Sequence, residues 1–413
     1  MSEKVKKIER CRISASQNLF SVLTLGTQAL TGVFPKAKGD SITAGPLELV
    51  WCPDSGLLQL QHSYDLSEMY GENYGYRSGL NQSMVTHLSK KAAYLESKYS
   101  LKDGDFAIDI GSNDGTLLNS YSTSGLKRVG IDPTGSKFRQ HYKDGVELIP
   151  DFFSASLFES NYPGKLAKIV TSVSMFYDLE DPSSFVADVR DVLDKDGLWH
   201  FEQSYMPAML RTNSYDTVCH EHLEYYSLGV VNRLLERNGL KVLDVQMNGI
   251  NGGSFAVTAA HRESKQAINR PVIDWLIGQE DRLGLDTPRP YRDFEERVYR
   301  HLEDLVRLIR SLRADGRLIV GYGASTKGNV LLQFCGLGDQ DISCIAEVNP
   351  EKFGSFTPGT LIPIHSEADV RKMRPDYMLV LPWHFRDSIV KREAEYLEKG
   401  GKLIFPMPEI EIV

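Results

Sequence analysis

Short apolar runs alternate with amphipathic segments through the middle of the chain. Apolar runs of about four to eight residues are typical of buried strands. They occur at 106–110, 129–132, 146–153, 167–173 and 198–202. Between the last two runs, Phe185, Val189 and Val192 recur at helical spacing after Asp181-Pro182, a pair that favours the start of a helix. This alternation predicts an α/β fold with an open, mostly parallel sheet.

The alternation continues on both sides of this unit. Flanking helices and late strands are predicted at 84–99, 228–238, 242–245 and 254–259. The composition changes at 262–290, and a long amphipathic helix at 298–312 then leads into a second α/β unit. Its strands and helix are predicted at 317–320, 342–346, 377–381, 402–405 and 329–337. Residues 1–60, by contrast, are predicted to be rich in turns.

Composition narrows the function classes. The 413 residues are 41% hydrophobic and 25% charged, which is ordinary for a globular enzyme of two or three domains. A net charge of −8 without a basic block argues against nucleic-acid and membrane-surface partners. The charged start, the lack of a long apolar stretch and five scattered cysteines predict a cytoplasmic protein without a signal peptide, membrane helix or disulfide framework.

Two acidic residues end neighbouring strands. Asp109 begins Asp-Ile-Gly-Ser-Asn-Asp-Gly, a turn before a helix predicted to start at Thr116, and its glycines let a ligand approach backbone N–H groups. This spacing differs from the Gly-x-Gly-x-x-Gly of dinucleotide folds. Asp132 ends the next strand, where a ribose presents its hydroxyls. An acid at both strand ends suits S-adenosylmethionine, which has a cationic amino-acid part and a ribose, while a generic α/β turn is the alternative.

Aromatic residues after the third strand and the loop after the fourth extend this site, because ligands bind at the carboxyl ends of such strands. The adenine is expected to lie beside residues 152–153. The predicted cofactor-binding residues are Asp109, Gly111, Ser112, Asn113, Gly115, Asp132, Phe152, Phe153 and Met175.

Two segments near the amino terminus each have half of a Cys-x-x-Cys knuckle. Serine takes the second position in both, giving Cys11-x-x-Ser14 and Cys52-x-x-Ser55. A four-cysteine zinc site needs four soft ligands, and serine hydroxyls are poor substitutes. We therefore expect two core thiols and no structural zinc; if zinc is present, Cys11 and Cys52 are its candidate ligands.

His220-Glu221-His222 is a candidate for proton transfer. Its histidines are two residues apart, unlike the His-Glu-x-x-His of zinc proteases, so metal binding is disfavoured. A histidine with a pKa of about 6.5 accepts a proton at neutral pH, which makes one of the two a general-base candidate. A pair of polar surface histidines is the alternative.

Two further segments each allow more than one interpretation. Gly-Tyr-Gly-Ala-Ser-Thr-Lys-Gly at 321–328 precedes a helix and places Lys327 where a diphosphate would bind; a structural turn and a nicotinamide site with Glu347 on the ribose are the alternatives. Residues 70–81 are dense in tyrosine with Arg77 and Ser78, which is compatible with interfacial packing or with a lid over a polar ligand.

Taken together, these segments resemble the sugar C-methyltransferases that act on nucleotide-linked deoxysugars. The resemblance covers essentially the whole chain and rests on Tyr-Gly-Tyr-Arg-Ser-Gly (74–79), Asp-Ile-Gly-Ser-Asn-Asp-Gly (109–115), Met-Phe-Tyr-Asp-Leu-Glu-Asp-Pro (175–182), His-Glu-His (220–222), Asn-Gly-Gly-Ser (251–254) and the 321–328 loop. It implies a small knuckle domain at 1–80, a class I, Rossmann-like methyltransferase domain at 81–262, and a second Rossmann-like domain at 263–413 that closes over the nucleotide-sugar.

The resemblance also implies residue roles. The histidine matching His222 is the proposed base, with Glu221 beside it and Tyr76 at the sugar. The chain departs from the family pattern at Ser14 and Ser55, at Cys219 where many members have tyrosine, and at Tyr177 where relatives have histidine. Because Cys219 and Tyr177 match sugar-pocket positions, the particular sugar does not carry over.

Carbon methylation needs a carbanion, so the implied substrate is a nucleotide-linked 4-keto-6-deoxyhexose, in which a C3 anion becomes an enolate. His222 is expected to remove the proton, and Tyr76 and Tyr177 to stabilise the enolate. The predicted substrate-binding residues are Arg77, Ser78, His220, Asn251, Tyr322, Ser325 and Lys327. An O- or N-methyltransferase, a nicotinamide-dependent oxidoreductase and a non-catalytic nucleotide-sugar-binding protein are the alternatives. The chain is expected to be a monomer or a homodimer.

Overall fold

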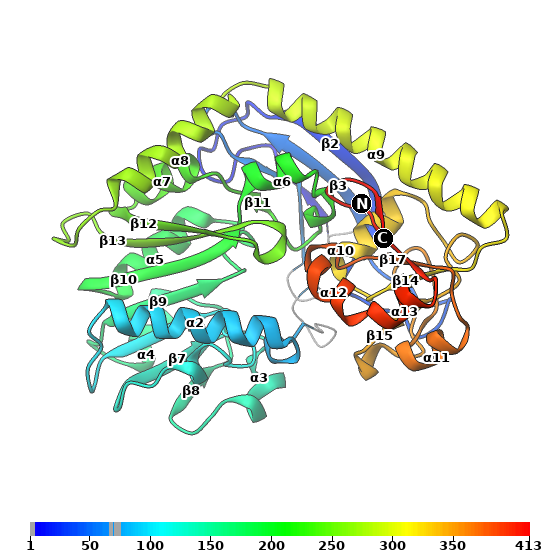
Figure 1. Ribbon diagram of the computed structural model, residues 1–413. Coiled ribbons are helices and arrows are strands. Elements are labelled where there is room, and N and C mark those ends of the chain that lie inside the picture. Colours follow the sequence, from blue (N-terminus) through cyan, green and yellow to red (C-terminus); the bar gives the residue numbers. More distant parts are fainter. Residues whose placement is uncertain (1–4, 66–68, 70–75) are drawn as a thin grey trace.

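A seven-stranded sheet forms the centre of the molecule in the computed structural model, which describes residues 5–65, 69 and 76–413 (Figure 1). Its strand order is β12-β13-β10-β9-β6-β7-β8, and β13 runs antiparallel to both of its neighbours. The strands are β6 Phe106–Ile110, β7 Lys127–Ile131, β8 Val146–Ile149, β9 Ala167–Val173, β10 Leu193–Ser204, β12 Leu240–Asn248 and β13 Ser254–His261. The prediction of an open, mostly parallel sheet is confirmed.

Helices cover this sheet and also lie in the segment between β10 and β12. They are α2 Gln82–Lys98, α3 Gly135–Phe138, α4 Ala155–Asn161, α5 Pro182–Val192, α6 Met206–Thr212 and α7 Leu228–Arg237. The expected cap of α5 is present, because the Asp181 carboxylate accepts a hydrogen bond from the Ser184 N–H. Single 3₁₀ turns lie at Tyr215–Thr217 (η4) and Ile250–Gly252 (η5).

The helix predicted at Thr116 is absent, and that prediction is wrong. Only a 3₁₀ turn, Leu118–Ser120, follows β6. The Asp114 carboxylate accepts hydrogen bonds from the N–H and the hydroxyl of Thr116 (3.2 and 2.6 Å), and such side-chain bonds compete with helix formation. Gly111, Asn113 and Gly115 have φ values of 72°, 51° and 73°, so the backbone turns repeatedly instead of coiling. The loop therefore has no helix dipole behind it.

The amino-terminal region contains a β-structure that the sequence pattern did not predict, although turns lie between its strands, at 12–14, 31–32 and 53–55. A four-stranded antiparallel sheet, in the order β11-β4-β3-β2, contains β2 Phe20–Ala29, β3 Ala44–Trp51, β4 Leu58–Leu60 and β11 Glu224–Tyr225. A separate pair joins β1 Val5–Lys7 to β5 His62–Tyr64. Because β11 comes from far along the chain, the amino-terminal sheet is completed by the segment that contains His220-Glu221-His222.

A six-stranded sheet forms the second α/β unit, as predicted. Its order is β16-β15-β14-β17-β18-β19, with β19 antiparallel to β18. The strands are β14 Ile319–Tyr322, β15 Ile345–Glu347, β16 Ile364–Ser366, β17 Tyr377–Val380, β18 Lys402–Phe405 and β19 Glu411–Ile412. The helices of this half are α8 Arg270–Leu283, α9 Arg289–Ala314, α10 Thr326–Phe334, α11 Glu367–Lys372, α12 Arg386–Arg392 and α13 Ala394–Glu398, with the 3₁₀ turn η7 at Trp383–Phe385.

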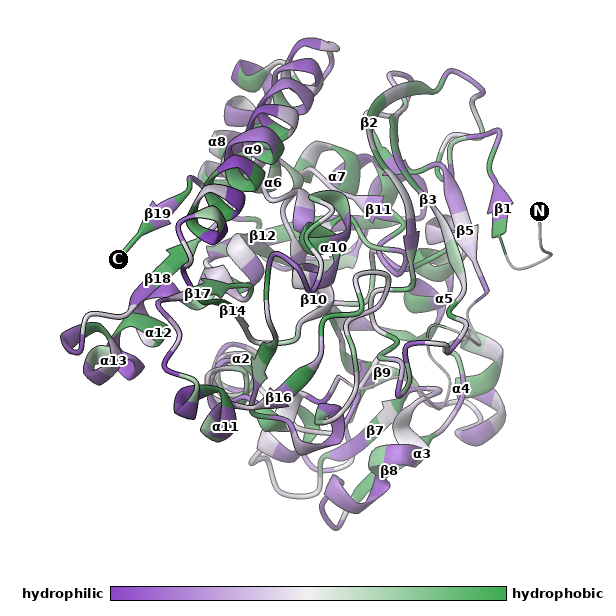
Figure 2. Ribbon diagram, turned by 90° about the vertical axis from the view of Figure 1, so that its right-hand side faces the viewer, coloured by the Kyte–Doolittle hydropathy of each residue, from purple (hydrophilic) through white to green (hydrophobic). Residues whose placement is uncertain are grey.

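The long helix α9 joins the parts of the fold. It runs along the top of the molecule, past β2 and β3 toward the carboxy-terminal sheet (Figure 1), and its outward side is hydrophilic (Figure 2). Its inward residues, among them Phe294, Val298 and Leu305, belong to one continuous hydrophobic core. That core contains Leu47 of β3 and Val320 of β14, so the amino-terminal and carboxy-terminal sheets are packed together.

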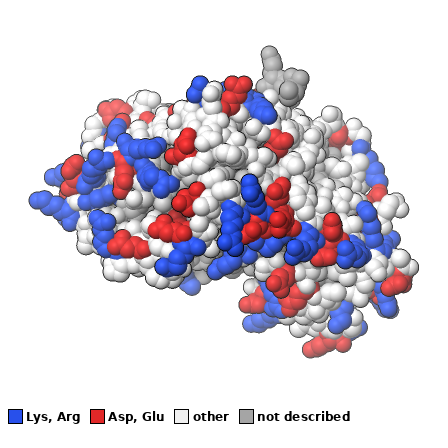
Figure 3. Space-filling view, turned by 90° about the horizontal axis from the view of Figure 1, so that it is seen from above, with Lys and Arg blue, Asp and Glu red and all other residues white. Residues whose placement is uncertain are grey.

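The surface agrees with the composition. Seen from above, basic and acidic side chains are interspersed along the molecule (Figure 3). Within residues 5–65, 69 and 76–413, no helix is both long enough and apolar enough to cross a membrane.

The two half-knuckles meet in space. The Cys11 Sγ lies 3.2 Å from the Ser55 Oγ, and the Ser14 Oγ lies 3.6 Å from the Cys52 Sγ. Each turn is followed by a residue in the left-handed region, Ala15 (φ 57°) or Gly56 (φ 76°). Burial raises the pKa of the Cys11 thiol, but hydrogen bonds with the two serines and with nearby backbone groups outweigh it and bring the pKa below its ordinary value.

This tetrad of two thiols and two hydroxyls has the arrangement of a zinc knuckle without its donor set. Zinc is held by thiolate, imidazole or carboxylate groups, and serine hydroxyls do not fit that chemistry. In the part of the chain that the structure describes, no three His, Cys, Asp or Glu side chains are grouped as metal ligands. Hydrogen bonds connect the four positions instead.

We predict that the unaltered protein retains no stoichiometric zinc and that Ser14→Cys with Ser55→Cys creates a zinc site. The double variant should hold about one zinc per chain after dialysis, because it completes a four-thiolate set. Elemental analysis of protein made in zinc-supplemented medium measures this. Ser97→Cys with Ser160→Cys, at two exposed positions, controls for added thiols. Dialysis-resistant zinc in the unaltered protein would contradict the prediction.

Candidate active site

A cavity of about 420 Å³ opens at the carboxyl ends of β6, β7 and β9. All of the predicted cofactor-binding residues line it except Gly115, and Tyr76 and Ser78 line it as well. Gly115 lies under the loop, where a Cβ would come within 2.9 Å of the Tyr142 ring. The sequence did not single out Leu179, Asp178 or Phe185 for this cavity, although the first two follow directly after Met175 and Tyr177.

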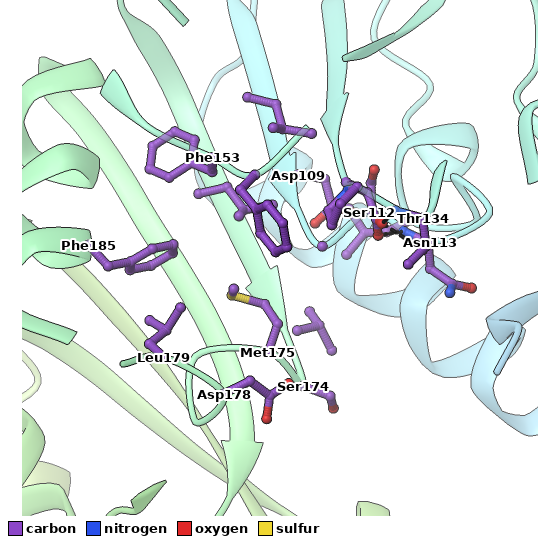
Figure 4. Close-up of a pocket in the computed structure, with 18 of the residues that line it drawn as sticks. Asp109, Ser112, Asn113, Thr134, Phe153, Ser174, Met175, Asp178, Leu179 and Phe185 are labelled. Carbon is purple, nitrogen blue, oxygen red and sulfur yellow. Dashed lines mark hydrogen bonds between the residues drawn. The ribbon is translucent and has the colours of Figure 1, made fainter. Parts of the chain in front are cut away.

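The two ends of the cavity differ in chemistry (Figure 4). Asp109, Ser112, Asn113 and Thr134 are grouped at one side, whereas Phe153, Phe185 and Leu179 are grouped at the other, with Met175 between them. The Phe153 and Phe185 rings meet edge to face, 5.5 Å between centroids. A polar end and an aromatic end suit the amino acid and the adenine of S-adenosylmethionine.

Asp132 holds the loop at the polar end. Its Oδ2 accepts a hydrogen bond from the Asn113 N–H (2.7 Å), and its Oδ1 accepts from the N–H and the hydroxyl of Thr134 (both 2.6 Å). This carboxylate therefore fixes the 111–115 loop relative to β7. Each carboxylate oxygen can accept more than one hydrogen bond, so ribose hydroxyls can still donate to it.

Asp109 is in a different environment. It is buried, and its Oδ1 accepts a hydrogen bond from the Thr171 hydroxyl (2.6 Å). Burial, with the charge of Asp132, outweighs the Thr171 bond and raises its pKa to about 7. An incoming cation would favour the ionised form of this carboxyl.

Residues 76–80 lie against the donor loop. The Ser78 and Gly79 N–H groups donate to the side chains of Asn113 (2.9 Å) and Asp114 (2.8 Å). Arg77 does not point into the cavity lining: its Nη1 is 2.7 Å from the His141 Nε2, and its Nε is 3.8 Å from Asp114. The rest of the predicted lid, residues 70–75 with Tyr70 and Tyr74, lies outside the described residues.

His222 has one ring nitrogen committed to the backbone. Its Nδ1 is 2.8 Å from the Thr217 carbonyl oxygen, so Nδ1 carries the hydrogen and Nε2 keeps a free lone pair. Burial lowers its pKa to about 4; the Thr217 bond raises it, and the Lys327 charge lowers it further. The Tyr177 ring packs edge-on against the imidazole, 4.4 Å between centroids. Tyr177 belongs to the loop that also carries Met175, so His222 lies next to a loop that lines the donor cavity.

The other two residues of His220-Glu221-His222 contact groups inside the protein. His220 is fully buried, with its ring edge-on to Tyr64 at 4.6 Å, and burial lowers its pKa to about 4. This position in the core favours a structural role over the substrate-binding role expected from the sequence. Burial raises the pKa of Glu221, and the carboxyl is hydrogen-bonded to the Cys219 thiol.

The 321–328 loop uses most of its polar groups internally. Ser325 caps α10 by accepting from the Gly328 N–H, and Tyr322 donates to Glu393. The Glu347 carboxylate accepts from the Ala324 N–H (2.8 Å), the position that a ribose or phosphate oxygen would otherwise take. These bonds favour the interpretation of the 321–328 loop as a structural turn over a diphosphate site or a nicotinamide site.

Lys327 is turned toward the methyltransferase sheet. Its Nζ donates to the Asn251 carbonyl oxygen (3.0 Å) in η5. Burial lowers its pKa, although the charge of Asp216 raises it. Lys327 and Asn251 therefore contact each other near His222. This contact directs Lys327 away from the backbone of the 321–328 loop, where a diphosphate was expected to bind.

The carboxyl edge of the second sheet supplies two residues that sequence reasoning missed. The Trp383 Nε1–H donates to the Asp216 Oδ2 (2.7 Å). Burial, together with the charge of Lys327, lowers the pKa of the neighbouring His384 to about 3. Both follow β17 in Leu-Pro-Trp-His-Phe, and polar residues at the carboxyl end of a parallel strand are the signal that could have identified them.

Comparisons with known proteins agree with this geometry. Family models match the chain in three consecutive parts: a putative zinc binding domain at residues 11–70, a methyltransferase domain at 84–245, and a C-methyltransferase C-terminal domain at 249–408. The C-methyltransferase NovU of Streptomyces niveus is 33% identical over 419 residues, which cover 100% of this chain and 99% of that protein. The chain belongs to the C-methyltransferase family. It is an S-adenosylmethionine-dependent enzyme with a class I methyltransferase fold, as predicted.

Solved structures of other methyltransferases are more distant. The mitomycin 7-O-methyltransferase MmcR is 18% identical, with 44% of this chain and 55% of that chain covered and a TM-score of 0.35. The magnesium protoporphyrin IX methyltransferase ChlM of Synechocystis PCC 6803 is 13% identical, with 43% and 79% covered and a TM-score of 0.32. Scores this low carry no argument about this chain.

The raised pKa of Asp109 predicts a pH-dependent affinity for the methyl donor. The donor's ammonium requires the carboxylate, so below pH 7 binding must first release a proton, and affinity should fall up to about tenfold per pH unit. Calorimetry with S-adenosylmethionine between pH 5.5 and pH 8.5 measures the slope, and two buffers of different ionisation enthalpy count the proton. Asp109→Asn should bind weakly with a flat profile. An unaltered protein with a flat profile would remove Asp109 from the ammonium site.

Replacing Asp132 tests the ribose contact. Asp132→Ala should weaken binding of S-adenosylmethionine by roughly 1.5–3 kcal/mol, because hydrogen bonds to a charged acceptor are lost. Asp132→Asn, which keeps one oxygen acceptor, should lose less. Asp144→Ala, at an exposed position, serves as the matched control. Equal calorimetric affinities for Asp132→Ala and Asp144→Ala would exclude Asp132 from the donor site.

Proposed function

We propose that this C-methyltransferase methylates C3 of a nucleotide-linked 4-keto-6-deoxysugar, with His222 as the general base. The observation that carries the proposal is the bond from the His222 Nδ1–H to the Thr217 carbonyl. It leaves the Nε2 lone pair as the acceptor, and burial keeps the ring neutral near pH 7. A neutral imidazole next to a loop that lines the donor cavity is in the state that a general base requires.

The substrate class follows from the acidity of carbon. A plain sugar carbon does not release a proton at neutral pH, but a carbon next to a ketone does, because its anion is an enolate. His222 would take the C3 proton on Nε2, and the electrons of the C3–H bond would enter the enolate. S-adenosylmethionine, when bound, supplies a methyl group already activated on a sulfonium, so the enzyme's contribution is proton removal and positioning.

Groups around His222 would stabilise both new charges. The Thr217 carbonyl accepts from Nδ1–H and so stabilises the imidazolium that forms. Tyr177 packs against His222, and Tyr76 lines the donor cavity from the other side, so their hydroxyls are candidates for the enolate oxygen. Such a donor contributes roughly 3 kcal/mol to the transition state. Glu221, whose pKa is raised by burial, would lie beside the base.

The nucleotide-sugar would enter between the two Rossmann-like units. Lys327 and Asn251 meet there, beside His222. An ammonium group at this position would attract the enolate or the diphosphate of the substrate. The 4-keto nucleotide-sugars can be screened with S-adenosylmethionine by mass spectrometry, where the expected product carries one additional methyl group on carbon. A methyl group found on oxygen or nitrogen would overturn the proposal.

His222→Asn tests the base. Asparagine resembles histidine in shape but is not basic, so turnover should fall by about 10²–10⁴ with little change in donor affinity. The direct measurement is deuterium exchange at C3 of the keto-sugar in heavy water, followed by NMR. His220→Asn is the matched control and should keep the exchange, because His220 lies in the core. If His222→Asn exchanges the proton as fast as the unaltered protein, the base lies elsewhere.

A further inference from the structure

One buried hydrogen bond joins the second Rossmann-like unit to the segment that carries the base. The Trp383 Nε1–H donates to the Asp216 Oδ2 at 2.7 Å, with Trp383 6% and Asp216 1% exposed. Trp383 begins η7 at the carboxyl end of β17, and Asp216 lies in η4. A buried carboxylate without a donor is costly, so this bond holds the two segments together.

The residue after Asp216 holds His222. The Thr217 carbonyl accepts from the His222 Nδ1–H (2.8 Å) and from the Tyr225 hydroxyl (3.3 Å). Its direction is set by the η4 turn, in which the Thr217 N–H and hydroxyl both donate to the Ser214 carbonyl (3.2 and 2.9 Å). A shift of Asp216 would therefore reorient the Thr217 carbonyl, whose hydrogen bond determines which ring nitrogen of His222 carries the hydrogen.

A glycine leaves room for the Trp383 ring. A Cβ on Gly252 would lie 3.1 Å from the Trp383 ring, and Gly252 has a φ of 89°. The neighbouring Asn251 carbonyl accepts from Lys327, which belongs to the same unit as Trp383. The Asn-Gly-Gly-Ser segment thus contacts Lys327 through Asn251 and Trp383 through Gly252.

We propose that Trp383 is a positioning residue for the reaction: its bond to Asp216 orients the Thr217 carbonyl and thereby sets the tautomer of His222. The base is then competent only when the second Rossmann-like unit is docked on the methyltransferase sheet. This inference rests on the proposed role of His222, and it gives that unit a part in proton removal in addition to substrate binding.

Trp383→Phe tests the proposal, because it keeps a ring in place and removes the N–H. We expect the rate of C3 deuterium exchange to fall about 10- to 100-fold, the usual cost of a lost bond to a buried charged group. Donor affinity by calorimetry should stay unchanged. The ¹⁵N NMR shifts of the His222 ring should change from the Nδ1–H tautomer to a mixture. Trp275→Phe, at an exposed position on α8, is the control.

A double-variant cycle separates this effect from a general structural one. Trp383→Phe should cost little more when His222 is already asparagine, because both changes act through the same proton transfer. An additive loss, or an unchanged His222 tautomer, would overturn the proposal. If Trp383→Phe does not bind the donor, Gly252→Ala, whose Cβ would press on the same ring, takes its place in the cycle.

The proposed function fails by a different result. If His222→Asn alone leaves C3 exchange intact, then His222 is not the base, whatever Trp383 does. The His222 tautomer is measured without turnover, so it still decides whether Trp383 orients the Thr217 carbonyl.

Discussion

Hydrogen bonds and an ion pair from three regions of the chain converge on one segment, residues 216–224, which contains the candidate base. The Asp216 carboxylate is paired by Trp383 from the second Rossmann-like unit, and Glu224 lies 3.6 Å from the Arg12 guanidinium of the amino-terminal region. The methyltransferase sheet contributes the Tyr177 carbonyl, which accepts from the Leu223 and Glu224 N–H groups. The candidate base lies within this segment, so its geometry exists only when the parts are assembled.

The two acids of the candidate donor site, Asp132 and Asp109, have different roles. Asp132 accepts three hydrogen bonds from the protein and so shapes the loop before any ligand arrives. Asp109 has a hydroxyl partner in Thr171, is buried, and has a raised pKa. A carboxyl group in that state gains most from a cation, since ionisation and binding favour each other. Local sequence places both acids at strand ends, but only their burial and partners distinguish them.

The sequence predicted what local pattern determines. Apolar runs predicted the strands of both Rossmann-like units except the short β16 and β19, and the predicted acids, with Gly111, line the cavity at the carboxyl ends of β6 and β7. It failed where side chains or distant segments decide the structure: the Asp114 carboxylate prevents the expected helix at Thr116, and the amino-terminal sheet needs β11. The pairing of Trp383 with Asp216 spans 167 positions. No periodicity encodes such a contact, so the positioning of the base was beyond sequence reasoning.

The four residues of the amino-terminal tetrad are linked by hydrogen bonds and packed against a large domain. Small domains depend on zinc when they cannot bury enough apolar surface alone. Here Cys11, Cys52 and Leu57 belong to the same hydrophobic core as Val230 of α7, and Arg233 of that helix donates to the Ser55 carbonyl (2.8 Å). The knuckles are thus packed against a large domain. That packing contributes stability of the kind that a metal gives to a small isolated domain, which is the physical basis for the prediction that the tetrad needs no zinc.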